Sequence, residues 1–174
     1  MSTSRISARV QRIKPSPSSA ASDRANELRR QGKSIINLVV GEPDFDTPAH
    51  IRAAACTAIE RGETRYTANA GTPQLRQAIV DKLQRENGLS YATSQVLVTS
   101  GAKSAIFNAF AATLGAGDEV LIPAPYWVSY PDMVLACEGE PVTLACPEEN
   151  AFKLTPTQLR DAITPRTRWP LLNT

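Results

Sequence analysis

The chain has 174 residues, of which 42% are hydrophobic and 21% are charged, and its formal net charge is +2. This length is enough for one domain with a continuous core, and the small net charge does not favour nucleic acid as a partner. No apolar run approaches the roughly 20 residues of a membrane helix, and the N-terminus lacks the apolar stretch of a secretory signal. We therefore expect no membrane partner and a cytoplasmic location.

The three cysteines are Cys56, Cys137 and Cys146, and each has apolar neighbours in the sequence. Their odd number and the lack of a CxxC pair argue against a disulfide framework and against a zinc site. We expect no metal, and three reduced, partly buried thiols.

The first predicted segment is a basic arm, rich in Ser and Pro, that runs to about Ser22. A helix is predicted from there to Gln31, where Gly32 occupies the C′ position and ends it. A short buried strand is predicted over residues 35–40 because the run is apolar and partly β-branched.

Two helices that begin with proline are predicted next. A helix over residues 48–61 has Thr47 as its N-cap, and Thr72 caps a second helix whose first residue is Pro73 and which Gly88 ends. The predicted apolar faces of the two helices comprise Ile51, Ala54, Ala55, Ala58 and Ile59 in the first and Leu75, Ile79 and Leu83 in the second.

From residue 96 onward, predicted strands and helices alternate. The strands cover residues 96–99, 119–123, 141–146 and 168–172, and the helices cover 102–114, 127–137 and 156–163. Strict alternation indicates an α/β fold with a mostly parallel sheet. Such sheets bind ligands outside the carboxyl ends of their strands.

The corner Ser100-Gly101-Ala102 follows one of these predicted strand ends and opens a helix. Its small residues allow close approach, and the first amides of a helix have no intrahelical partner, so an anion such as phosphate fits there. The sequence matches neither GxxxxGK[ST] nor GxGxxG, and a simple strand-to-helix turn stays open as the alternative. Lys103 in the first helical turn favours a nearby anion, against the alternative of a solvated lysine.

Two further positions raise a question about burial. Trp127 follows the predicted strand 119–123, and the residues alone favour a core position over stacking on a planar ligand. Pro170 lies within the predicted strand 168–172, where it removes a ladder hydrogen bond and argues against a central strand. We expect there either an unpaired, frayed strand in a truncated product or a local sequence change.

Five segments, in this order, resemble the N-terminal half of the pyridoxal-phosphate-dependent aminotransferases of fold type I. They are GEPDFDTP, RYTANAGTPQLRQAI, VTSGAKSA, GDEVLIPAPYWVSYPDMV and LTPTQLRDAITPRTR, and the resemblance is closest to the bacterial aspartate aminotransferases, some of which use prephenate. It implies a mostly parallel sheet flanked by helices, truncated before the second half of the large domain. The implied domains are an arm and small-domain segment over 1–45 and the first part of the large domain over 46–174.

The resemblance implies a role for several residues toward the cofactor, pyridoxal 5′-phosphate. Gly101, Ala102 and Lys103 occupy the turn that holds its phosphate. Trp127 matches the aromatic residue that stacks on the pyridine ring and lines the substrate pocket. Tyr66 matches the tyrosine that reaches across a homodimer to the phosphate of the neighbouring subunit.

The resemblance also implies substrate contacts. Gly41 matches the glycine whose backbone meets the substrate near its α-carboxylate. Lys103 resembles the lysine that recognises the distal carboxylate of an acidic substrate, and Lys14 resembles an arm residue linked to prephenate use. The implied reaction moves the amino group of L-aspartate to a 2-oxo acid, with glutamate and prephenate as further candidate partners.

The family's Schiff-base lysine is expected beyond Thr174, together with the aspartate that contacts the ring nitrogen and the arginine that binds the α-carboxylate. We expect Lys33, Lys82 and Lys153 to be solvated charges and not substitutes for that lysine. Two alternatives stay open: a catalytically inactive truncated fragment of such an enzyme, and an unrelated α/β binding domain whose corner is purely structural.

Overall fold

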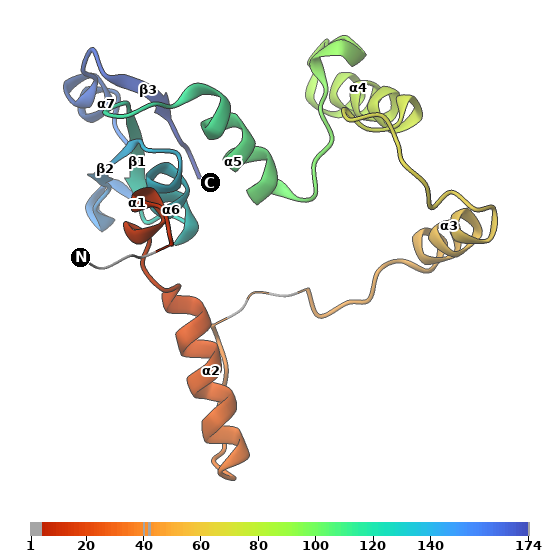
Figure 1. Ribbon diagram of the computed structural model, residues 1–174, viewed down its shortest axis with the longest axis horizontal. Helices are drawn as coiled ribbons and strands as arrows, with labels where there is room; N and C mark the ends of the chain where they lie inside the picture. Colours follow the sequence, from red (N-terminus) through yellow and green to blue (C-terminus); the bar gives the residue numbers. More distant parts are fainter. Residues whose placement is uncertain (1–4, 40, 42, 174) are drawn as a thin grey trace. The chain divides into compact units, whose positions relative to one another are not determined.

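The computed structural model describes residues 5–39, 41 and 43–173, and the chain divides into two compact units. The first unit comprises Met1–Val40 and Ile106–Thr174, and the second comprises Gly41–Ala105. The chain returns from the second unit to the first within helix α5 (Ala102–Thr113), and the other elements each belong to one unit (Figure 1). The predicted domain boundary between residues 45 and 46 concerns the arrangement in the family and stays a prediction.

A three-stranded parallel sheet forms the centre of the first unit. Its strands lie in the order β2-β1-β3 and comprise β1 (Glu119–Ala124), β2 (Glu140–Ala145) and β3 (Thr167–Pro170). The pairing of β1 with β2 runs from Glu119 opposite Glu140 to Ala124 opposite Ala145. The parallel sheet and the alternation of its strands with helices are thus confirmed.

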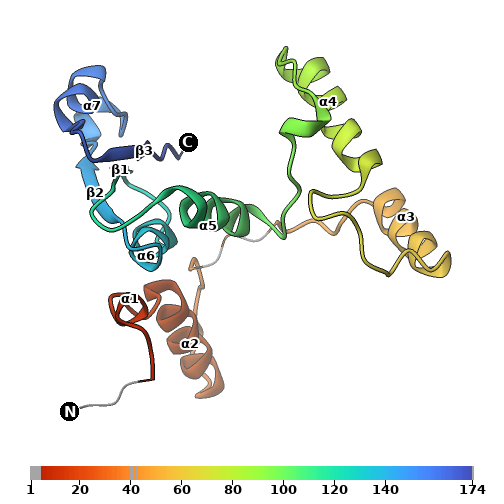
Figure 2. The same cartoon turned by 45° about the horizontal axis from the view of Figure 1, so that its top comes forward.

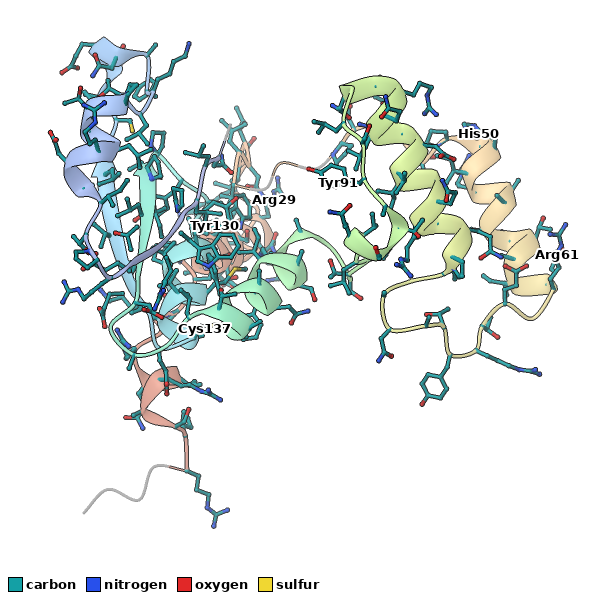
Figure 3. The ribbon with its side chains drawn as sticks, turned by 90° about the horizontal axis from the view of Figure 1, so that it is seen from above. Arg29, His50, Arg61, Tyr91, Tyr130 and Cys137 are labelled. Carbon is teal, nitrogen blue, oxygen red and sulfur yellow. The ribbon has the colours of Figure 1, made fainter. Side chains whose placement is uncertain are left out.

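The core of this unit lies between β1 and two helices, α5 and α6 (Ser129–Ala136). Its buried members are Phe110, Val120, Ile122, Val134 and Cys137. Tyr130 packs against this cluster, and Figure 3 shows it and Cys137 among the crowded side chains beside the sheet. Helix α7 (Pro156–Ala162) begins at a capping box in which Thr155 and Gln158 exchange hydrogen bonds.

Trp169 of β3 completes the core. Its ring lies edge-on to Phe110, with centroids 6.0 Å apart and planes at 71°. The indole N–H donates to the Thr113 hydroxyl at 2.8 Å, so the polar atom of the side chain also has a partner. This residue ties the last strand to α5.

Strand β3 pairs with β1, so the expectation of an unpaired strand is wrong. Thr167 lies opposite Glu119 and, after a register shift, Trp169 lies opposite Val120. The Leu171 amide donates to the Leu121 carbonyl at 2.9 Å. Because alternate residues of a strand face the same neighbour, the missing amide of the exposed Pro170 points away from β1 and costs no bond in this ladder.

The N-terminal arm is more helical than predicted, with α1 (Ala8–Gln11) and α2 (Pro17–Arg30). Helix α2 begins five residues before the predicted Ser22, because Ser16 accepts a hydrogen bond from the Ser19 amide at 3.4 Å and Pro17 occupies the first helical position. Gly32, with φ of 79°, follows its C-cap as predicted.

The strand predicted over residues 35–40 is absent from residues 35–39, and Val40 lies outside the described residues. Ile36 and Leu38 are 87% and 89% exposed. The Val39 amide donates to the side chain of Asn37 at 2.9 Å instead of to a neighbouring strand. An apolar run forms a strand only where another strand accepts its backbone hydrogen bonds, and no strand in the described part of the chain does so.

The second unit contains α3 (Ala49–Glu60), α4 (Pro73–Asn87), the 3-10 helix η1 (Thr93–Gln95) and the start of α5 (Figure 2). Both predicted ends of α4 are confirmed: Thr72 accepts the Leu75 amide at 3.3 Å, and Gly88 ends the helix in the left-handed region. Helix α3 begins one residue later than predicted, with Pro48 at the N-cap position in place of Thr47.

Every residue of helix α3 except the half-buried Ala58 is exposed, which contradicts the expectations of a buried apolar face and of a partly buried Cys56. Its apolar residues include Ile51 and Ile59, which are both exposed, and Cys56 is exposed as well. Figure 3 labels His50 on this helix and Arg61 at its C-cap. Cys137 and Cys146 are buried, as expected. Among the described residues, no helix is long and apolar enough to cross a membrane.

Candidate functional site

The corner that opens α5 is shaped by hydrogen bonds within the turn. Gly101 has φ of 85°, a conformation that favours glycine, and no atom lies within 4 Å of the point where a Cβ would project. Its amide donates to the Thr99 carbonyl at 2.8 Å. The Thr99 hydroxyl in turn donates to the Gly101 carbonyl at 3.1 Å. The space in front of the glycine is open.

The amides of residues 102–104 lie in the first turn of α5, as predicted from the sequence. The first hydrogen bond of α5 runs from the Ala105 amide to the Gly101 carbonyl at 3.3 Å, so the three preceding amides lie at the positive end of a 12-residue helix. Gly101, Ala102 and Lys103 are exposed. Amide donors at the start of a helix suit an anion, and the space at Gly101 is open on their side of the turn.

The segment that leads to this corner is not the strand predicted over residues 96–99. It has no ladder partner within the described ranges, and the turn η1 directly precedes it. The Val98 amide donates to the Ala70 carbonyl at 3.0 Å. Gly71, with φ of 98°, lies so close that an added Cβ would be 2.7 Å from Val98 Cγ2.

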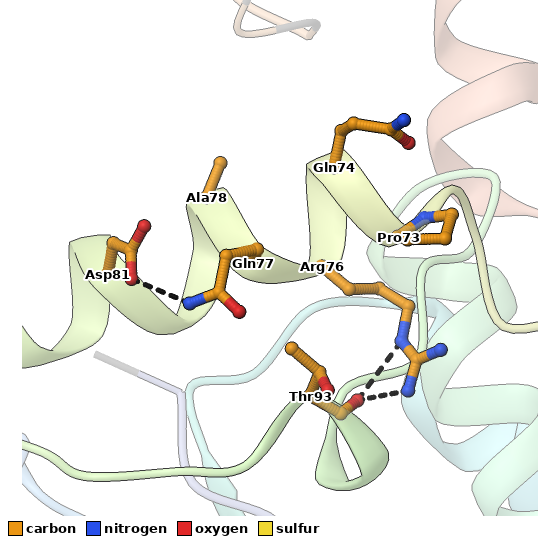
Figure 4. Close-up of a pocket in the computed structure, with 7 residues that line it drawn as sticks. All are labelled: Pro73, Gln74, Arg76, Gln77, Ala78, Asp81 and Thr93. Carbon is orange, nitrogen blue, oxygen red and sulfur yellow. Dashed lines mark hydrogen bonds between the residues drawn. The ribbon is translucent and has the colours of Figure 1, made fainter.

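Arg76 of α4 holds the start of the same segment, and sequence reasoning missed it. Its Nε and Nη2 both donate to the Thr93 carbonyl, with Nε at 3.0 Å (Figure 4). Nε also donates to the Val96 carbonyl at 3.1 Å. A signal was present, since an arginine in the first turn of a helix opposes the helix dipole, as Lys103 does.

A hollow lies beside α4, and Figure 4 draws the residues that line it. Its lining residues are Pro73, Gln74, Arg76, Gln77, Ala78, Asp81 and Thr93. None of the site residues predicted from the sequence lines it. The hollow and the corner at Gly101 are therefore separate features of the second unit. Arg76 lines the hollow and also donates to Val96 in the segment that leads to the corner.

Trp127 belongs to the first unit and is 50% exposed, so the core position favoured by the residues alone is wrong. It follows the carboxyl end of β1 and the cis Ala124–Pro125 peptide, and its carbonyl accepts the Tyr130 amide at 3.1 Å. Part of the indole faces solvent, which is the arrangement that stacking on a planar ligand requires.

Lys14 lies against the start of α6. It helps to line a cavity in the first unit together with Ile13, Ser16, Phe107, Val128, Ser129, Asp132, Met133 and Ala136. The structure thus brings the predicted arm residue beside the segment that follows Trp127. The cavity joins an ammonium, a carboxylate and apolar side chains from three parts of the chain.

Tyr66 and Gly41 are exposed residues of the second unit. Tyr66 has its whole side chain exposed, and nothing lies within 4 Å of a Cβ built on Gly41. The predicted site residues are therefore divided: Gly101–Lys103, Tyr66 and Gly41 lie in the second unit, and Trp127 and Lys14 lie in the first. Within one unit, the structure brings together the corner residues alone.

The other lysines singled out from the sequence are surface charges, as predicted. Lys33 and Lys153 are exposed. The Lys82 ammonium lies 3.3 Å from Glu86 and donates to the Asn87 side chain at 2.9 Å. No group of three or more His, Cys, Asp or Glu residues in the described parts of the chain could hold a metal ion.

A charged cluster lies at the amino end of β1, opposite the end that leads to Trp127. The buried Glu119 accepts a hydrogen bond from the Thr164 hydroxyl at 2.6 Å and from Arg166 Nε at 2.8 Å. The Thr164 bond first and the Arg166 guanidinium next hold the pKa of Glu119 below its ordinary value. The Gly115 amide and Arg168 lower the pKa of the neighbouring Asp118. These carboxylates are charged, paired and remote from the strand end that leads to Trp127.

Comparison with known proteins identifies relatives of one kind. The family model for aminotransferase class I and II matches residues 33–173. The chain is 54% identical over 168 residues to the aspartate/prephenate aminotransferase of Cereibacter sphaeroides, covering 97% of this chain and 42% of the relative. It is 57% identical over 150 residues to the aspartate aminotransferase of Rhizobium meliloti, covering 86% of this chain and 37% of the relative.

Solved structures give the same result. The crystal structure of the Rhizobium meliloti aspartate aminotransferase aligns with a TM-score of 0.94 and 51% identity, over 98% of this chain and 43% of that one. The Thermus thermophilus aspartate aminotransferase with maleate aligns with a TM-score of 0.94 and 46% identity, over 99% and 45% of the two chains. The chain thus spans less than half the length of the relatives it matches. Its α/β fold with a parallel sheet is part of their fold.

Proposed function

The chain belongs to the aminotransferase class I and II family, and from that membership we propose that the complete protein is a pyridoxal-phosphate-dependent transaminase of the aspartate type. The observation that carries the proposal is the anion corner at Gly101, found within a chain that is more than half identical to aspartate aminotransferases along most of its length. An unrelated binding domain with a purely structural corner would not share that identity.

We propose that the corner binds the cofactor phosphate. The amides of residues 102–104 donate to its oxygens, and the Lys103 ammonium adds charge either to the phosphate or to the distal carboxylate of an acidic substrate. The half-exposed Trp127 stacks on the ring and borders the substrate. When bound, pyridoxal 5′-phosphate supplies the electron sink for amino-group transfer, and the protein supplies binding and orientation.

The remaining residues bind substrate or join subunits in this proposal. Gly41 offers its backbone to the substrate near the α-carboxylate, and Lys14 contacts a second acidic substrate such as prephenate from its position beside α6. The exposed Tyr66 reaches the phosphate of a neighbouring subunit in a homodimer. L-aspartate is the proposed amino donor and a 2-oxo acid the acceptor, in the cytoplasm.

A second candidate concerns the 174-residue chain on its own. Because it spans 42% of the length of its relative from Cereibacter sphaeroides, we propose as the alternative that this chain alone binds the cofactor phosphate and does not catalyse transfer. The lysine that would carry the cofactor is then supplied by sequence beyond Thr174. Lys33, Lys82 and Lys153 do not replace it, because all three lie on the surface.

One spectroscopic experiment separates the two candidates. The 174-residue chain is mixed with pyridoxal phosphate, and its visible spectrum is recorded before and after addition of L-aspartate and of borohydride. An absorption band that responds to aspartate and that borohydride fixes onto one specific lysine supports transamination by this chain and excludes the inactive alternative. Phosphate-dependent binding without such a band supports the alternative. Equal affinities for pyridoxal phosphate and for pyridoxal would overturn the proposed role of the corner.

A further inference from the structure

The position of the corner at Gly101 depends on the segment that precedes it. Residues 96–99 connect η1 to the corner, and no strand in the described part of the chain pairs with them. The hydrogen bonds that fix the segment come from α4 and from the loop before it.

Arg76 makes the first of these attachments. Two of its guanidinium nitrogens donate to the Thr93 carbonyl, and Nε is also 3.1 Å from the Val96 carbonyl. The hydrogen bonds to Thr93 and Val96 are partly buried, which strengthens them. A planar guanidinium can span two carbonyls in this way, whereas a lysine ammonium binds as a single point.

The second attachment is made by Ala70, next to Gly71. The Ala70 carbonyl accepts the Val98 amide at 3.0 Å, and the absence of a Cβ at Gly71 leaves room for the Val98 side chain. Thr72 caps α4 directly after this glycine, so the loop is anchored to the same helix that carries Arg76. The chain is therefore held at Thr93, Val96 and Val98, and Gly101 follows three residues later.

We infer that Arg76, with Gly71, is a positioning residue for the anion corner: it fixes the 93–98 segment on α4 and so sets the direction of the amides at residues 102–104. This inference rests on the proposed function, because the corner must bind the cofactor phosphate for the position of its amides to matter. Arg76 itself does not touch the ligand.

The test compares the affinities of the 174-residue chain for pyridoxal phosphate and for pyridoxal, which lacks the phosphate. The variants are Arg76→Met and the milder Arg76→Lys, and the matched control is Arg85→Met, an exposed arginine on the same helix that pairs with Glu86. We expect Arg76→Met to lower the preference for the phosphorylated ligand about tenfold, equivalent to one weakened hydrogen bond to a charged group. Arg76→Lys should restore part of the preference, and Arg85→Met should leave it unchanged.

The ratio of the two affinities separates the possible results. A loss that is equal for both ligands, or an unchanged preference in Arg76→Met, overturns the inference and leaves the proposed function intact. A wild-type chain with no preference for the phosphorylated ligand overturns the proposed function and the inference with it. If Arg76→Met does not fold, Arg76→Lys decides the question alone, because a preference equal to that of Arg85→Met would then overturn the inference.

Discussion

The two units of this chain are stabilised in different ways. The sheet unit has a core in which Phe110, Val120 and Ile122 are no more than 1% exposed. The unit of residues 41–105 has no buried residue among those described, and its helices are defined by N-caps, by a left-handed glycine and by the Arg76 hydrogen bonds. The first unit thus depends on apolar burial and the second on local hydrogen bonds, so substitutions of similar size should have unequal effects.

The largest expected effect comes from the core of the sheet unit. Phe110→Ala removes a buried ring that also contacts Trp169, and should lower the free energy of unfolding by about 3–5 kcal/mol. The matched substitution in the other unit is Leu75→Ala on the exposed side of α4, with an expected change of about 0.5 kcal/mol or less. Denaturant titrations of the 174-residue chain measure both. Equal losses would contradict the contrast between the units.

A smaller effect is expected at the cap of α4. Thr72→Ala removes the hydroxyl that accepts the Leu75 amide and should destabilise the helix by about 1 kcal/mol. Amide hydrogen exchange should show faster opening of α4 with no change in β1. Thr57→Ala, at an exposed position within α3, serves as the control and should leave α4 unaffected. Faster exchange in β1 would show that the two units do not unfold separately.

The smallest effect should appear only in acid. Because the pKa of Glu119 is lowered in the folded chain, the stability it contributes is complete above the ordinary glutamate pKa of about 4.3 and is lost as the pH falls through that value toward the lowered one. Glu119→Gln should therefore flatten the decline in stability between about pH 5 and pH 3. The exposed Glu148→Gln should retain the wild-type decline. Unfolding midpoints across this range measure the difference.

Local signals predicted most of the fold. The N-cap of α4, Gly88, and the alternation of strands and helices from β1 onward lie within a residue or two of their predicted positions. The strands predicted at 35–40 and 96–99 are absent from the described residues 35–39 and 96–99 for one reason. A strand depends on a hydrogen-bonding neighbour that can lie far away in the sequence, and apolar composition alone does not report whether that neighbour is present.

The candidate site shows the same difference between features set by local residues and features set by distant ones. The corner at Gly101 could be recognised from small residues before a helix, because its turn is made by bonds between neighbours such as Thr99 and Gly101. The exposure of Trp127 could not be predicted from neighbouring residues, because it depends on how β1 and α6 pack. Arg76 was missed because its partners lie 17 and 20 residues away, and only the fold brings them together.

The unequal burial of the three cysteines gives the chain a built-in reporter. Cys56 on α3 is exposed, whereas Cys137 and Cys146 are buried and burial raises the pKa of Cys137, which slows its alkylation. A maleimide should therefore label the native chain once, in the second unit. Cys137 and Cys146 become reactive only when the sheet unit opens. One label per molecule therefore indicates a folded sheet unit, and three labels indicate an unfolded one.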